Sequence, residues 1–269
     1  MKVDLKALIG DLNKPDGPEN YRARLRLRNE TARVGGKGQE EERKEFAAAL
    51  AKAVVESHGR EQRRGGLPQQ PPANRGMRDE LLRSLCEIAG AAEVSVLMPL
   101  VENSEERDNS RRAIAEDVDV RDFVRRAIEC IPGDEATVAL AQMAVKGAGT
   151  EFRIGAINAL GKRKNAEAMK ALQACAADPD PRIRLAAADA LSNIGDPSAM
   201  PAIGQSFDPN RGWAPHANAA RTQLRLASNV GKTGNKQAAD QIYRSVGAQA
   251  EPYQVKAAQI GVQQPLPRR

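Results

Sequence analysis

Two histidines and three cysteines are the residues of this 269-residue sequence best suited to metal binding or covalent chemistry. His58 and His216 stand far apart in the chain, and neither belongs to an HExxH or HxxEH motif. Zinc sites need three or four converging ligands, and no CxxC pair supplies them. The sequence therefore predicts neither a metal site nor a bound cofactor. Unpaired cysteines commonly lie in apolar cores, which is where we expect Cys86, Cys130 and Cys175.

A Gly-Lys-Thr triplet at 231–233 has the composition of a phosphate-binding loop. Such a loop needs a glycine five positions before Gly231, where this chain has Leu226, and it must follow a strand rather than a helix. The triplet therefore predicts no nucleotide site. No catalytic residue is predicted anywhere, and a protein without enzymatic activity is favoured.

Segment 207–232 concentrates residue types that are typical of binding surfaces. Tryptophan and arginine dominate the energetics of many interfaces, and this segment holds the only Trp of the chain. One interpretation is a partner-binding site; the other is an inter-repeat loop whose Trp packs over the next helix. The candidate binding residues are Arg211, Trp213, His216, Arg221 and Arg225.

Four basic residues recur at one position of a repeated pattern: Arg125, Arg153, Arg184 and Lys256. They could form a basic stripe for an anionic partner. Residues that recur in every repeat usually serve repeat stacking, however, so the structural role is favoured. We expect each to pair with an acid of a neighbouring repeat, such as Asp122 or Asp189.

The elements that must position these residues follow from an internal repeat. Residues 149–178 align with 180–208 at a shift of 31, which matches Arg153 with Arg184 and Leu160 with Leu191. A period of this size is the mark of a helical array, in which no unit can bury its own apolar face alone. An Asp-Pro start and a break near Gly161 or Gly195 predict two short helices in each unit. Weaker copies are visible at 77–103, 120–147 and 250–262.

The pattern D-x-x-[VIF]-R-x-x-A-x-x-A-L-G over 77–262 resembles the HEAT-repeat family, in particular the short bacterial repeats of phycobilin lyases. The resemblance implies an all-α fold: an α-solenoid, or right-handed superhelix of stacked antiparallel helix pairs. It also implies that the first helices face the convex side and the second helices the concave side. Di-iron hydroxylases that resemble HEAT arrays carry repeated His-Glu pairs, which this sequence lacks.

Residues 1–59 form a predicted helical segment that fits a degenerate repeat. The arginines of 18–34 alternate as in a strand, but the stop at Gly35-Gly36 and a cap from Glu19 or Asn20 favour a helix. Residues 60–76 are predicted to be a flexible linker, 77–262 the repeat array, and 263–269 a C-terminal tail.

The net charge of +6 is unevenly distributed. Residues 1–75 have 16 basic and 11 acidic side chains, residues 76–208 have 16 and 22, and residues 209–269 have 9 and 2. No apolar run reaches membrane-spanning length and no signal peptide is visible, which indicates a bacterial-type cytoplasmic protein.

The favoured function is a scaffold or adaptor that binds a protein partner through its concave face. A nucleic-acid-binding protein that uses the basic C-terminal segment is the first alternative. A chromophore lyase or isomerase subunit is the second, and it depends on the resemblance alone. The last repeat supplies only one helix, at 252–261, which predicts head-to-tail self-association or continuation into a longer array.

Overall fold

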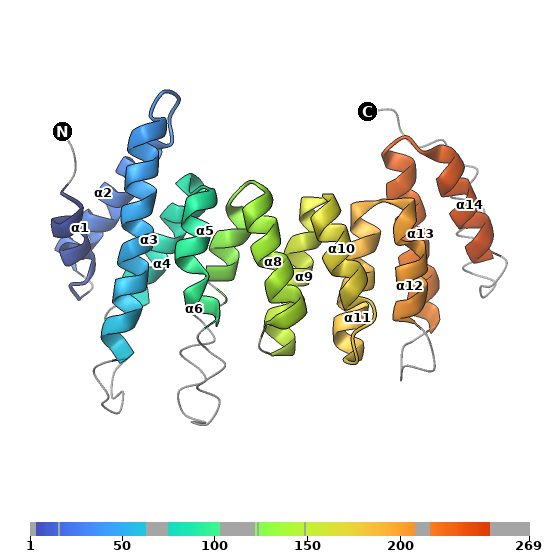
Figure 1. The fold of residues 1–269 in the computed structure, drawn as a ribbon. Coiled ribbons are helices and arrows are strands. Elements are labelled where there is room, and N and C mark those ends of the chain that lie inside the picture. Colours follow the sequence, from blue (N-terminus) through green and yellow to red (C-terminus); the bar gives the residue numbers. More distant parts are fainter. Residues whose placement is uncertain are drawn as a thin grey trace. The chain divides into compact units, whose positions relative to one another are not determined.

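The computed structural model describes residues 4–15, 17–62, 75–102, 122, 124–147, 149–207 and 216–247 (Figure 1). All regular structure within these ranges is helical, and neighbouring helices pack against one another in chain order. The predicted all-α class, with stacked helix pairs of the α-solenoid type, is therefore confirmed. The chain divides into two compact units, at residues 1–139 and 140–269.

Unit 1 opens with a short helix and a long basic one. Helix α1 (Leu5–Leu12) begins at Asp4, whose carboxylate accepts hydrogen bonds from two backbone N–H groups of the first turn. Helix α2 (Pro18–Val34) confirms the helical interpretation of this segment over the alternating strand. One side of α2 is buried and includes Ala23, Leu27 and Val34, whereas its arginines lie on the other sides of the helix.

The start of α2 differs from the expectation. Gly17 is the N-cap and Pro18 occupies the first helical position, where a missing N–H costs nothing. Asn20 instead turns its amide back to the carbonyl oxygens of Leu12 and Lys14, at 2.8 and 3.0 Å. Asn20 therefore fixes the α1–α2 turn rather than capping α2.

Helix α3 (Glu40–Gln62) packs against α4 (Arg75–Ile88) and α5 (Ala91–Leu97), and α4 also packs against α2. The short helix α6 (Pro99–Glu102) follows α5. The predicted linker 60–76 therefore overlaps the end of α3 and the start of α4, and its centre, 63–74, lies outside the described residues. Residues 124–130 form one more helix of this unit. Helix α8 (Asp134–Lys146) contains the boundary between the two units.

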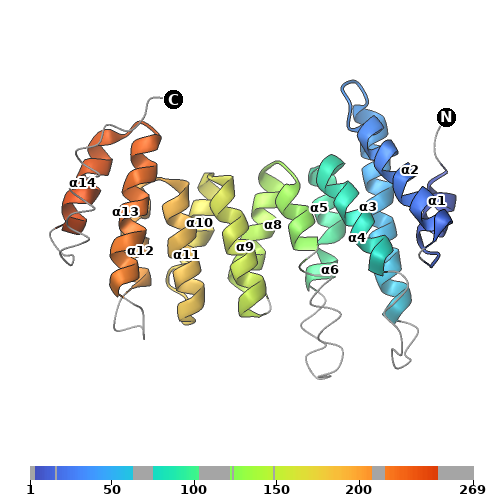
Figure 2. The same ribbon diagram turned by 180° about the vertical axis from the view of Figure 1, so that it is seen from behind.

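Unit 2 contains the clearest helix pairs. The first pair is α9 (Thr150–Arg163) with α10 (Ala166–Cys175). The second is α11 (Pro181–Ile194) with the 3-10 helix η2 (Pro197–Ala199) and α12 (Met200–Ser206). The third is α13 (His216–Lys232) with α14 (Lys236–Gly247). Figure 2 shows them following one another along the unit.

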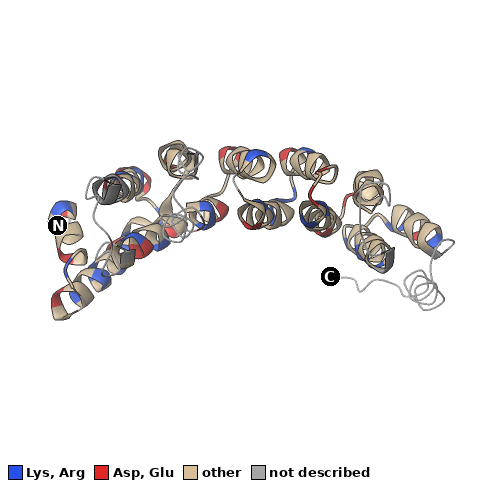
Figure 3. Cartoon of the chain, turned by 90° about the horizontal axis from the view of Figure 1, so that it is seen from below, with Lys and Arg blue, Asp and Glu red and all other residues tan. Residues whose placement is uncertain are grey.

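The first helices of these pairs form the closely packed layer of unit 2. Helix α11 packs against both α9 and α13, and among the described residues this contact is more extensive than any between α10 and α12 (Figure 3). Small side chains allow it, since Ala156, Ala159, Ala187 and Ala190 are all buried. Which layer lines the concave side, for which the family resemblance implies the second helices, stays a prediction.

The end of α9 also differs from the expectation. The helix continues through Gly161 and ends at Lys164, which has a left-handed backbone with φ of 54°. The equivalent position 31 residues later is Gly195, with φ of 76°. Gly161 serves packing instead, because a Cβ there would lie 3.0 Å from the Cα of Ala190 in α11.

Among the described residues, no helix is both long and apolar enough to cross a bilayer. The predicted tail at 263–269 and the last predicted helix at 252–261 lie outside the described part of the chain.

Candidate functional site

The exposed side of the α9, α11 and α13 layer is the candidate functional surface, which we call the first-helix face. Each helix contributes residues that are three or four positions apart, so that their side chains lie on one side of the helix. Ile154 and Leu185 are half-buried apolar residues at equivalent positions of α9 and α11. The polar members of the face are Glu151, Asn158, Lys162, Arg182, Asp189, Asn193, Arg221, Arg225 and Asn229.

Polar bonds between helices hold this face together. Arg182 of α11 forms an ion pair with Glu151 of α9. Arg225 of α13 pairs with Asp189 of α11 and donates a hydrogen bond from Nε to the Ser192 hydroxyl at 2.7 Å. These pairs are widely exposed, so each contributes little to stability, but together they fix the register of the three helices.

A second bond supports the register of α11 and α13. The Asn229 amide donates to the backbone carbonyl of Ser192 at 2.9 Å. Gly195, the residue that follows α11, allows the backbone of Asn229 to approach, since a Cβ at Gly195 would lie 3.1 Å from it. The first-helix face is therefore a preorganised surface rather than a set of independent side chains.

The predicted partner-binding residues divide into two groups. Arg221 and Arg225 lie one turn apart on the first-helix face, and Arg225 forms an ion pair with Asp189. Arg221 is exposed and makes no hydrogen bond to any described residue. His216 begins α13, but its side chain lies outside the described set, as do Arg211 and Trp213 altogether.

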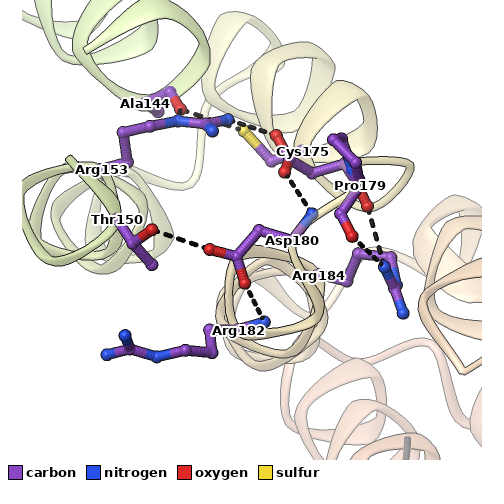
Figure 4. A network of polar contacts seen from close by, with 9 residues as sticks. Ala144, Thr150, Arg153, Cys175, Pro179, Asp180, Arg182 and Arg184 are labelled. Carbon is purple, nitrogen blue, oxygen red and sulfur yellow. Dashed lines mark hydrogen bonds and ion pairs between the residues drawn. The ribbon is translucent and has the colours of Figure 1, made fainter. Parts of the chain in front are cut away.

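A partly buried polar network joins helices α8, α9, α10 and α11 around the α10–α11 connection (Figure 4). Arg153 donates from Nε to the Ala144 carbonyl at 2.8 Å, in the last turn of α8, and forms an ion pair with Asp178. The thiol of Cys175 donates to the same Ala144 carbonyl at 3.6 Å. These bonds satisfy a carbonyl near a helix end that would otherwise lack a partner.

Asp180 is the second node of this network. One of its carboxylate oxygens accepts a hydrogen bond from the Thr150 hydroxyl at 2.7 Å, and the other caps α11 at the N–H of Arg182 at 2.8 Å. The Thr150 hydroxyl, more than any other neighbour, lowers the pKa of Asp180. The ionised carboxylate thus ties the start of α9 to the start of α11.

Arg184 is fully buried, and backbone carbonyls are among its partners. Its guanidinium donates to the backbone carbonyls of Asp178 and Pro179, both at 3.0 Å, and to that of Ser206 at 3.4 Å. Asp189, one of the acids suggested for the recurring basic residues, pairs with Arg225. The repeat pattern identified the recurring arginine but did not predict its bonds to backbone carbonyls.

Arg125 also differs from the expectation of bonds between repeats. It bonds to Asp122 and Glu129, which lie one turn before and after it on its own segment. Lys256, the fourth member of the predicted ladder, lies outside the described residues. Each of the three described arginines is engaged by carboxylates or backbone carbonyls of the protein itself, which supports the structural role for these three positions.

The cysteines separate by exposure. Cys175 is buried as predicted, and burial raises the pKa of its thiol to about 11. Cys130 is exposed and Cys86 is half-buried, so the core prediction is wrong for Cys130. Across the described ranges, no group of three or more His, Cys, Asp and Glu residues could hold a metal ion.

Ile154 and Leu185 are members of the first-helix face that the sequence interpretation missed. Their signal was present: each lies four residues before a polar position, Asn158 or Asp189, that the repeat places on an exposed side.

Comparison with known proteins bears on the family. Residues 137–214 match the family model described as HEAT repeats. No curated protein sequence matches the chain significantly. A solved structure of human deoxyhypusine hydroxylase in complex with glycerol overlaps 96% of this chain and 94% of that one, at 13% identity and a TM-score of 0.35. That overlap is too weak to carry any property of the enzyme to this protein. The match covers the helices that carry Arg153 and Arg184, and over residues 137–214 this chain is similar to HEAT repeats.

Proposed function

We propose that this protein is a non-enzymatic scaffold or adaptor that docks a protein partner on the first-helix face of unit 2. The observation that carries the proposal is the pairing of apolar and polar positions on that face. Ile154 and Leu185 leave part of their apolar surface in water, and polar or charged residues of the same helices lie three residues before and four residues after each of them. An apolar centre with a polar rim is typical of protein interfaces.

The charge of the face indicates the chemistry of its partner. Helices α9 and α11 carry both positive and negative side chains, and the charges of Arg182 and Glu151 neutralise one another in an ion pair. Helix α13 adds Arg221 and Lys232, both exposed, and no acidic residue. A partner segment with apolar side chains over Ile154 and Leu185 and acidic groups over α13 therefore complements this surface.

Affinity capture from the source cells tests the proposal with paired variants. Leu185→Glu places a charge at the centre of the first-helix face, and we expect it to lower capture of the specific partner at least tenfold. Gln205→Glu is the matched control, because it adds the same charge at an exposed position of α12, in the other layer. Both variants must show the helical circular dichroism and melting curve of the wild type.

Equal capture by wild type and Leu185→Glu would contradict the docking surface. Loss of capture by Gln205→Glu alone would move the site to the second helices, where the family resemblance placed it. Trp213→Ala and Arg211→Ala extend the test to the predicted binding loop.

Nucleic-acid binding is supported by one observation, the basic charge of residues 216–247. They hold Arg221, Arg225, Lys232, Lys236 and Arg244 against a single acid, Asp240. Base stacking needs exposed aromatic rings, but Tyr243, the only aromatic residue in this stretch, is only 8% exposed. Fluorescence anisotropy with single-stranded RNA and duplex DNA over a salt series decides between the two functions. A bilin-transfer assay tests the chromophore-lyase alternative. Fractionation of the source cells tests the predicted cytoplasmic location.

A further inference from the structure

We infer that Cys86 and Cys130 form a dithiol site in unit 1, which closes to an intramolecular disulfide by exchange with a small-molecule disulfide such as oxidised glutathione. This site is independent of the first-helix face, because both cysteines belong to residues 1–139. The proposed docking function does not enter the argument.

The geometry brings together two cysteines that are distant in the sequence. The Cys86 thiol, in the last turn of α4, donates a hydrogen bond to the backbone carbonyl of Arg126 at 3.9 Å. Arg126 lies one helical turn before Cys130, within the helix of residues 124–130. Side chains of a helix tilt toward its N-terminus, so the Cys130 side chain leans over the turn that Cys86 contacts. In agreement with this placement, the Cys130 thiol contributes, after burial, to the raised pKa of Cys86.

Exposure gives the two cysteines different roles. Cys130 is exposed and meets reagents from solution, whereas Cys86 is half-buried behind it. Burial, more than the neighbouring thiol, raises the pKa of Cys86 to about 12, so Cys86 is held as the neutral thiol. Thiolates are the attacking species in exchange reactions, and Cys130 is therefore the first to react.

The exchange proceeds in two balanced steps. The Cys130 thiolate attacks one sulfur of oxidised glutathione, which forms a mixed disulfide and releases one glutathione thiolate. Cys86 then loses its proton to solvent, attacks the Cys130 sulfur and expels the second glutathione as a thiolate. The two electrons that the two cysteines lose reside on the two released glutathione thiolates, which take up protons from water.

A metal is a poorer occupant than a disulfide. Two sulfurs supply half of a tetrahedral zinc shell, and within the described ranges no third ligand joins them. The disulfide, in contrast, needs only this pair. It would fasten α4 to the helix of residues 124–130 and restrict the unfolded chain between them, which stabilises the folded state.

Intact mass spectrometry of the full chain with oxidised glutathione tests the site. Wild type and Cys175→Ser should lose two hydrogens, with a crosslinked peptide that joins Cys86 to Cys130. Cys86→Ser should stop at a single glutathione adduct on Cys130. The rates of adduct formation in the two single variants should also differ. Glutathione should react with Cys86 in the Cys130→Ser variant at least tenfold more slowly than with Cys130 in the Cys86→Ser variant.

Three outcomes would overturn the inference: a wild type that stops at the glutathione adduct, a disulfide that includes Cys175, or a disulfide that joins two chains. Phenylarsine oxide gives a second measurement that needs no oxidation, because trivalent arsenic bridges two adjacent sulfurs. It should form a one-to-one adduct with wild type and Cys175→Ser and none with Cys86→Ser. Failure to bind folded wild type would also refute the site, whatever the stability of the serine variants.

Discussion

At the scale of single residues, Arg184 shows that a recurring basic side chain can serve the backbone rather than a ligand. Its buried guanidinium is bonded to the carbonyls of Asp178 and Pro179. Arg184→Met keeps an apolar side chain but removes the hydrogen-bond donor of these carbonyls. A buried polar group without a hydrogen-bond partner destabilises the folded state. We expect a loss of about 2 to 4 kcal/mol in the free energy of unfolding. Urea denaturation followed by circular dichroism measures it.

The matched control is Arg182→Met, two residues earlier on the same helix. Arg182 is exposed and paired with Glu151 at the surface, so its replacement should cost less than about 1 kcal/mol. Equal losses in the two variants would show that the bonds of Arg184 to the backbone contribute nothing special.

At the scale of elements, the paired helix ends at Lys164 and Gly195 offer an internal comparison. Both positions are left-handed, a conformation that suits glycine and strains a residue with a Cβ. Lys164→Gly should therefore raise the free energy of unfolding by about 0.5 kcal/mol. Gly195→Ala should lower it by about 1 to 2 kcal/mol, because the new Cβ is strained and also meets Asn229.

Thermal melts of both variants beside wild type measure these effects. A melting temperature that falls for Lys164→Gly would mean that the lysine side chain stabilises this helix end by more than its backbone strain costs.

At the scale of the whole molecule, the segregated charge predicts association between copies. Residues 76–208 have a balance of −6 and residues 209–269 of +7, so opposite segments of two chains attract. Sedimentation velocity should show concentration-dependent association in about 0.05 M salt. Raising the salt to about 0.5 M should abolish it, because screening then acts within a few ångströms.

The charge variant Lys236→Glu with Arg244→Glu should weaken this association without changing the helix content, since both side chains are exposed on α14. A sharp monomer at every concentration in low salt would refute the head-to-tail prediction.

The sequence by itself determined the repeat and its helices. The period of 31 and the Asp-Pro start predicted α11, and the long basic segment 18–34 was correctly interpreted as α2. These features are local: a cap, a proline at the first turn and an apolar period act within a few residues, so one segment carries the whole signal.

The tertiary structure decided which side chains meet. Arg225 pairs with Asp189, Arg184 bonds to backbone carbonyls, and the Cys86 thiol bonds to the carbonyl of Arg126. No local pattern predicted these partners. Each contact depends on the shift and rotation of one helix against the next, which small residues such as Gly161 set through packing. A shift of one residue would exchange every partner while leaving the helical pattern of the sequence unchanged, and for that reason only the packed helices fix the surfaces and sites of this protein.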